Sequence, residues 1–181
     1  QTVENNSTVI FLRQIMKIKT TDMLIDIQKQ ADNAGATNTR IIRDKDFIAY
    51  ESVIASCAAN TCGNYGRCWT CPPMNGSFEF FTEELSKYKN AIVVQNISAL
   101  EDSYDFDGMQ KAMKIHNDMI RDLKIKLEAR YPDNDLLILG CGGCGYCEKC
   151  SCPDSPCNYP DKAISSLEGY GIEVRPMVLE S

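Results

Sequence analysis

Apolar residues recur along the chain with periods that predict alternating helices and strands. Between residues 21 and 34 they return every three or four positions, which predicts a helix capped by Thr21 or Asp22 and ended by Gly35. A second helix is predicted to begin near Ser77, and the longest spans residues 107–130. Continuous apolar runs predict buried strands at residues 91–95 and 136–139.

The remaining segments carry weaker patterns. Two β-rich runs, at residues 39–43 and 47–50, predict a hairpin or two strands of a small sheet. Residues 161–167 predict a helix and residues 172–178 a last strand at the edge of the sheet. Residues 1–19 show no clear period, so we expect an N-terminal arm with room for one short strand. The chain then reads as an α/β fold, with helices packed on a small mixed sheet and residues 20–181 forming one domain.

Composition narrows the classes of partner. A chain of 181 residues with 44% hydrophobic residues can bury a sizeable core. Its formal net charge of −6, with no long run of lysine or arginine, argues against nucleic acid as a partner. No apolar stretch approaches the roughly 18 residues of a membrane span, so we expect no membrane partner.

A cysteine-rich segment follows the predicted strand at residues 136–139. Residues 140–160 contain six cysteines, and Cys144, Cys147 and Cys150 stand at every third position before Cys157 and Pro160. Three such thiolates and a later cysteine near a proline are typical of a cubane iron–sulfur cluster, since a glycine-rich loop can wrap several corners of one compact core. Zinc is the competing metal, although it more often takes two separated pairs of cysteines. We call these four cysteines the second motif.

Another group of four cysteines lies earlier in the chain and is called the first motif: Cys57, Cys62, Cys68 and Cys71. Its spacing matches no common ferredoxin pattern, and buried structural cysteines are the alternative. Four cysteines among polar and glycine residues nevertheless favour a second metal site. The ten cysteines gather in these two regions, with none between residues 72 and 140. This distribution favours a reducing cytoplasm over a secreted disulfide scaffold.

Five further side chains deserve an interpretation. Tyr65 and Trp69 stand between cysteines of the first motif, where aromatic rings commonly shield a cluster from water. Arg67 and Lys149 could offset the negative charge of ligated thiolates, or simply face solvent. His116 is the only histidine and falls inside the apolar stripe of the longest helix, so we expect a core histidine and keep a ligand role as the alternative.

Several short motifs together resemble a known family. They are Gly35-Ala36, Cys57 to Cys62 continuing through Asn64-Tyr65-Gly66 to Cys71-Pro72-Pro73, Tyr88-Lys89-Asn90-Ala91, Cys144-x2-Cys147-x2-Cys150-x6-Cys157-x2-Pro160, and Ser165-x2-Glu168-x2-Gly171-Ile172. This set resembles a family of small prokaryotic proteins described only as predicted metal-binding proteins of unknown function, over about residues 20–178.

The resemblance implies a ligand set for each site. It selects Cys57, Cys62 and Cys71 in the first motif, and Cys144, Cys147, Cys150 and Cys157 in the second. Cys68, Cys141 and Cys152 would be extra cysteines of this sequence. Cys141 or Cys152 could replace a ligand of the second site or act as a redox-active spare thiol. With three cysteines a [4Fe–4S] cluster keeps one iron open to another ligand, whereas Cys68 as a fourth would close it.

The sequence therefore predicts an iron–sulfur protein, with two [4Fe–4S] clusters as its cofactors. Its function would be electron transfer to a redox partner protein, or reduction of a small molecule, in which case it would be an iron–sulfur oxidoreductase. A zinc-structured module for protein interaction and a carrier of a metal or cofactor are the alternatives.

Overall fold

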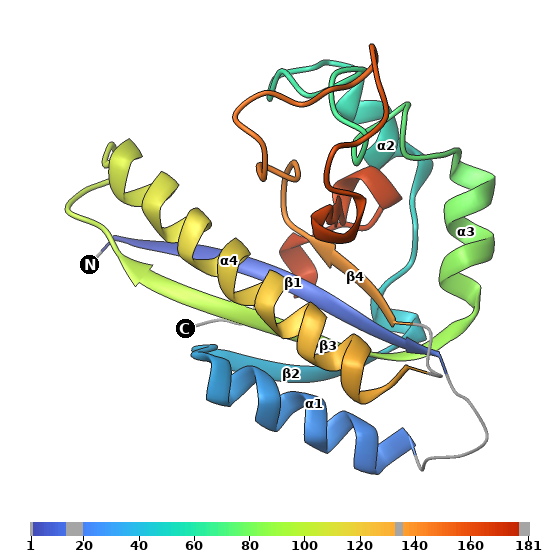
Figure 1. The fold of residues 1–181 in the computed structure, drawn as a ribbon, viewed down its shortest axis with the longest axis vertical. Coiled ribbons are helices and arrows are strands. Elements are labelled where there is room, and N and C mark those ends of the chain that lie inside the picture. The colour runs from blue at the N-terminus through green and yellow to red at the C-terminus, as the bar shows by residue number, and fades with distance from the viewer. Residues whose placement is uncertain (1, 14–19, 133–135, 178–181) are drawn as a thin grey trace.

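The computed structural model describes residues 2–13, 20–132 and 136–177. One central sheet carries helices on both faces (Figure 1). Its elements, in chain order, are β1 (Val3–Arg13), α1 (Thr20–Ala34), β2 (Asn38–Arg43), η1 (Asp44–Asp46), α2 (Glu51–Cys57), α3 (Phe78–Ser86), β3 (Tyr88–Ala99), α4 (Phe106–Arg130), β4 (Leu136–Gly140), η2 (Pro160–Lys162), β5 (Ser165–Ser166), η3 (Glu168–Tyr170) and η4 (Arg175–Met177).

The five strands lie in the order β2-β3-β1-β4-β5. β1 pairs antiparallel with both β3 and β4, and β2 pairs antiparallel with β3. Among the strands of the described residues, only β4 and β5 run parallel. The α/β fold with a mixed sheet is therefore confirmed, and the sheet is antiparallel across most of its width.

The central strand β1 differs from the expected short strand in an N-terminal arm. It is 11 residues long and hydrogen-bonds to a neighbour on each side. Residues 6–12 are all buried, because both faces of the sheet are covered. A strand buried on both faces shows no alternation of polar and apolar positions, so periodicity could not reveal it.

Helices α1 and α4 lie side by side over one face of the sheet (Figure 1). The apolar stripe predicted for α4 supplies Ile120, Leu123 and Leu127, which pack on Ile10 and Leu12 of β1. Burying each of these side chains stabilises the fold by roughly 1.5–3 kcal/mol. The predicted bounds of both helices are confirmed within a residue or two.

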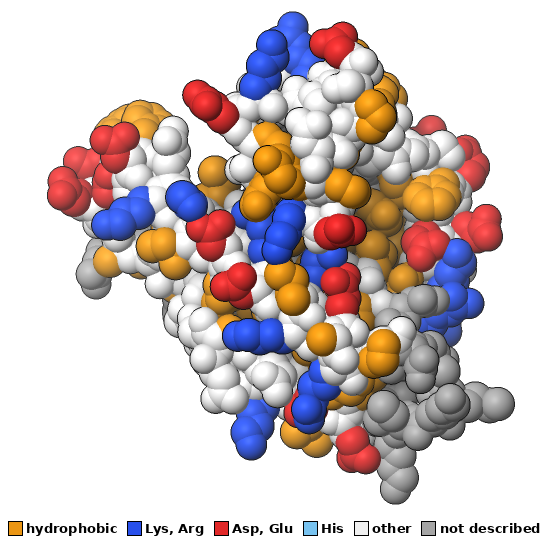
Figure 2. Space-filling view, viewed as in Figure 1, with side chains coloured by type: hydrophobic (Ala, Val, Ile, Leu, Met, Phe, Trp, Pro, Cys, Tyr) orange, Lys and Arg blue, Asp and Glu red, His pale blue; other side chains and the backbone are white. Residues whose placement is uncertain are grey.

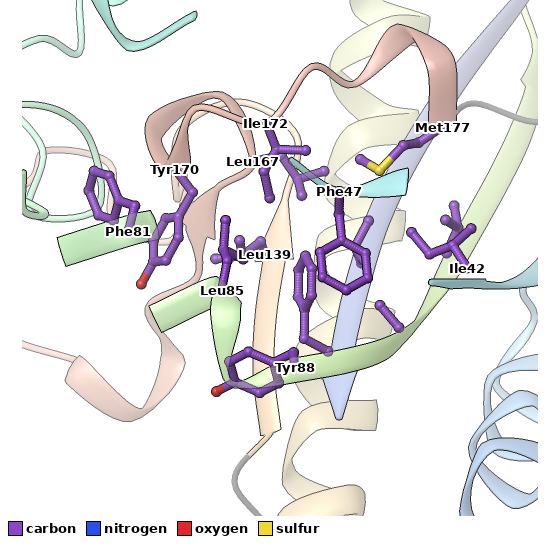
Figure 3. Packing of buried hydrophobic residues seen from close by; sticks show 14 residues of the cluster. Ile42, Phe47, Phe81, Leu85, Tyr88, Leu139, Leu167, Tyr170, Ile172 and Met177 are labelled. Carbon is purple, nitrogen blue, oxygen red and sulfur yellow. The ribbon is translucent and has the colours of Figure 1, made fainter. Parts of the chain in front are cut away.

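The opposite face is covered by α3 and by the C-terminal segment, which meet in an aromatic cluster (Figure 3). Phe11 of β1 packs edge-on against Phe47 with ring centroids 4.9 Å apart. The ring centroids of Phe81 in α3 and Tyr170 in the C-terminal segment lie 4.3 Å apart. As predicted, α3 begins after Ser77, whose side chain accepts a hydrogen bond from the Phe80 N–H.

Three weaker predictions are wrong in part. Residues 47–50 form no strand beyond an isolated bridge between Ala49 and Ile172, and α2 begins directly afterwards. Residues 161–167 form a 3-10 turn and the short β5 instead of a helix. The strand predicted at 172–178 is reduced to that same bridge and to η4, and residue 178 lies outside the described residues. Burial of Leu167, Ile172 and Met177 holds this segment on the sheet without regular backbone pairing.

The two cysteine-rich loops lie together at one end of the molecule, at the top of Figure 1. The first begins where α2 ends at Cys57, and the second begins where β4 ends at Gly140. Both loops therefore begin where α2 and β4 end and lie at the same end of the molecule.

The surface over α1 and α4 carries acidic and basic side chains in alternation, without a broad basic area (Figure 2). Within the described part of the chain, no helix combines the length and the apolar character needed to cross a membrane.

Candidate metal centres

Hydrogen bonds join the loops of the first and second motifs. The Trp69 indole N–H, in the first motif, donates to the Ser155 carbonyl at 3.0 Å. The Cys152 thiol donates to the Gly66 carbonyl with an S–O distance of 3.8 Å. These contacts explain how cysteines about 90 positions apart in sequence come to share one end of the fold.

The second motif surrounds a cavity of about 260 Å³. All four of its cysteines line this cavity: Cys144, Cys147, Cys150 and Cys157. Cys68 of the first motif lines it as well. The structure thus gathers the four residues that the sequence selected and adds a fifth thiol from the other loop.

The first motif borders a separate cavity of about 360 Å³. Cys57, Cys62 and Cys71 line it, and Glu168 from η3 lines the same cavity. Cys68 is absent from this lining. The three cysteines implied by the family resemblance are therefore brought together, while the fourth cysteine of the motif faces the neighbouring cavity.

The two cavities are neighbours. Asn64 lines both of them, and it packs so closely on the second loop that a Cβ added to Gly143 would lie 2.8 Å from its Nδ2 atom. The Cys68 and Cys71 side chains, one at each cavity, are hydrogen-bonded to each other. A short stretch of side chains thus connects the two sites.

Thiols dominate the donor set of both cavities. Across residues 2–13, 20–132 and 136–177, no three cysteine, histidine or carboxylate side chains converge on a single metal position. Thiolates select zinc, copper(I) and iron–sulfur clusters. The thiols of each cavity are therefore of the donor type that such a group needs.

The Cys68 and Cys71 thiols, which lie between the two cavities, have pKa values shifted in opposite directions. A hydrogen bond from Cys71, followed by bonds from Thr70 and from the Cys144 backbone, lowers the pKa of Cys68 to about 4. The same contact with Cys68, together with burial, raises the pKa of Cys71. These contacts favour the thiolate form of Cys68, which is the form that binds a metal.

Burial and the negative charge of Glu168 raise the pKa of Cys57. The pKa of Cys141 is raised to about 12, mainly by burial. Cys141 is partly buried against the aromatic face of the core and lines neither cavity, so it serves as a small hydrophobic residue there.

Arg121 supports the second motif, and sequence reasoning missed it. Its side chain is only 7% exposed. The guanidinium donates to the Cys144 carbonyl at 2.5 Å and to the Lys162 carbonyl at 3.3 Å, and it lies over the Tyr146 ring. α4 thereby holds one side of the loop in place and brings a positive charge beside it. Arg121 lies on a helix that carries no cysteine, so spacing offered no signal.

His116 is a core residue, as expected. It is 2% exposed and hydrogen-bonds to the Thr8 hydroxyl and the Asn96 side chain at 2.9 and 2.7 Å. Burial lowers its pKa to about 4. It lines neither cysteine cavity, so the alternative ligand role finds no support in the described residues.

The other side chains singled out from sequence lie at the sites. Tyr65 lines the first cavity, and Trp69, Arg67 and Lys149 line the second. The aromatic rings therefore occupy positions from which they can shield a bound group, and the two cations lie near the thiols of the second motif.

Comparison with known proteins agrees with the motif resemblance. Residues 40–181 match the family described as "Predicted metal-binding protein (DUF2284)", a range that contains both cysteine motifs and Glu168. Neither the curated proteins nor the solved structures gave a match. Because the match spans most of the chain, this protein belongs to the DUF2284 family of predicted metal-binding proteins.

Proposed function

We propose that this protein is a redox protein with two iron–sulfur centres. The proposal depends on one observation above all, the pair of neighbouring cysteine-lined cavities that share Asn64. Cys144, Cys147, Cys150 and Cys157 would hold one [4Fe–4S] cluster, and Cys57, Cys62 and Cys71 would hold the other. Such clusters supply reversible one-electron transfer at potentials set by charge, hydrogen bonds and solvent access.

Residues of this chain would tune the second centre and connect it to the first. At the second centre, Arg121 places a buried positive charge beside the Cys144 backbone, which favours the more negative, reduced state and so raises the potential. The hydrogen-bonded pair of Cys68 and Cys71 spans the boundary between the cavities and provides a path of two side chains. The two centres would therefore exchange electrons along this path.

The first centre is the one that a partner could reach. Its cavity of about 360 Å³ is the larger of the two, and Cys62 on its wall is exposed. A redox partner protein or a small molecule could therefore approach this centre, and in the second event the protein would be an oxidoreductase. All ten cysteines are free thiols in the described chain, as metal ligation requires, and we propose the cytoplasm as their compartment.

The test is the content of iron, acid-labile sulfide and zinc per chain, measured with an absorption spectrum on protein purified without oxygen. About eight irons and eight sulfides per chain are expected for two cubane clusters. Zinc without sulfide would overturn the proposal and leave a zinc-structured interaction module. Clusters that pass intact to an acceptor apoprotein, with no reversible redox change of their own, would instead identify a carrier.

A further inference from the structure

The first centre has one ligand fewer than a cubane cluster can take. Three cysteines, Cys57, Cys62 and Cys71, line its cavity. The two other thiols nearby are committed elsewhere, since Cys68 lines the second cavity and Cys141 packs against the core. A [4Fe–4S] cluster held by three thiolates has a fourth iron that needs another donor.

Glu168 is the remaining metal-binding side chain on the wall of that cavity. Its side chain lines the cavity together with those of Cys57, Cys62 and Cys71. One carboxylate oxygen, Oε2, accepts a hydrogen bond from the Gly142 N–H at 3.2 Å. Within the described residues Glu168 forms no ion pair. A partly buried carboxylate beside three thiols and without a cation lacks a partner of opposite charge.

The backbone fixes Glu168 relative to the first motif. The Tyr50 N–H, just before α2, donates to the Gly171 carbonyl at 2.8 Å. Gly171 has φ +79°, and a Cβ there would lie 2.9 Å from the Tyr50 carbonyl oxygen, so only glycine permits this approach. On the other side, the Asn75 side chain donates to the Gly169 carbonyl at 3.3 Å. η3 is thus tied both to the helix that ends at Cys57 and to the chain that leaves Cys71.

We propose that Glu168 is the fourth, non-cysteine ligand of the first metal centre. This assignment rests on the proposed iron–sulfur function for the identity of the metal. The Gly142 N–H holds Oε2 and orients the group, which leaves Oε1 as the donor to the metal. A carboxylate is a harder donor than a thiolate and suits iron–sulfur chemistry less well, so it is the ligand that an incoming small molecule can displace.

The first experiment measures the loss of the uniquely ligated iron. Ferricyanide converts a [4Fe–4S]²⁺ cluster to [3Fe–4S]⁺ with release of one Fe²⁺ and one electron, and electron paramagnetic resonance detects the product. In Glu168→Gln the amide oxygen can still accept from Gly142, so the fold is retained while the negative donor is lost. We expect the conversion to be at least about tenfold faster than in wild type, because even outer partners of metal ligands alter affinity by 10–100-fold.

Two further variants make the result specific. Glu173→Gln removes an exposed carboxylate from the same C-terminal segment, away from the cavity, and should convert at the wild-type rate. Glu168→Cys supplies a fourth thiolate and should convert more slowly than Glu168→Gln. Equal conversion rates in wild type and Glu168→Gln would overturn the assignment, even where both proteins contain eight irons.

The failure of the proposed function has a different signature. Zinc without sulfide in the wild-type protein would refute the iron–sulfur centres. The Glu168 assignment is then decided by competition with a chromophoric zinc chelator. A loss of zinc affinity of about tenfold or more in Glu168→Gln would support Glu168 as a ligand, and unchanged affinity would overturn it.

Discussion

Replacing Arg121 with methionine tests whether α4 holds the second motif in place. Methionine keeps most of the buried stem and removes the guanidinium, together with its bonds to the Cys144 and Lys162 carbonyls. A hydrogen bond with a charged partner contributes about 1.5–3 kcal/mol, and the 2.5 Å bond to Cys144 is the stronger of the two. The cation over Tyr146 adds roughly 0.5–2 kcal/mol.

Two effects reduce the stability loss expected from removing these contacts of Arg121. Removing a buried charge relieves its desolvation cost, and the ion pair with the half-exposed Asp118 contributes under about 1 kcal/mol. We therefore expect Arg121→Met to lower the free energy of unfolding by about 2–4 kcal/mol, measured by urea unfolding of the metal-loaded protein without oxygen. Metal at the second centre should also be lost faster to a chelator, since the Cys144 carbonyl loses its tether.

The matched control is Lys114→Met on the same helix. Lys114 pairs with the same Asp118 at 2.6 Å, but its side chain is 76% exposed. The expected decrease in the free energy of unfolding is therefore below about 1 kcal/mol. Equal stability losses in the two variants, or unchanged metal release in Arg121→Met, would refute the conclusion that Arg121 anchors the loop.

Two other outcomes follow from the structure. Because Cys71 and Cys147 line different cavities, Cys71→Ser and Cys147→Ser should each reduce the iron content from about eight to about four per chain. Cys141→Ser should leave the iron content unchanged. Loss of all iron in Cys71→Ser or Cys147→Ser would show that the two centres are interdependent. The pKa of His116 is about 4 when folded, against 6.5 as its ordinary value. Below pH 6.5 the unfolded chain takes up a proton that the folded chain refuses, so stability should fall by about 2 kcal/mol between pH 7 and pH 5. This fall should be missing in His116→Gln, as urea unfolding at both pH values would show.

The sequence predicted helices best where one face is buried and the other exposed. α4 shows this best, because its buried Ile120, Leu123 and Leu127 alternate with exposed residues such as Ile125 and Glu128. The full length of β1 escaped prediction, since both of its faces are covered and its residues show no alternation. The C-terminal segment escaped because its apolar residues fill spaces on the sheet and follow no fixed period.

Cysteine spacing predicted only in part which cysteines line which cavity. Spacing grouped the second motif correctly, because a loop of glycine and cysteine can bring its own thiols around one space. It could not tell which cavity Cys68 faces, since Cys68 and Cys71 are three positions apart and still point to different sites. Side-chain direction within such a turn depends on the contact with the other loop, which lies far away in sequence.

The family resemblance included Glu168 in a motif without giving it a role, and the fold supplies a reason for that motif. Gly171 allows the close approach to Tyr50, and Gly169 accepts a bond from Asn75, so the glycines around Glu168 lock η3 onto the first motif. Burial and the nearby Glu168 carboxylate both raise the pKa of Cys57, which makes the metal-free site harder to ionise. A metal ion or a cationic cluster core held between the carboxylate and the thiolates would offset that cost, in agreement with the ligand role proposed for Glu168.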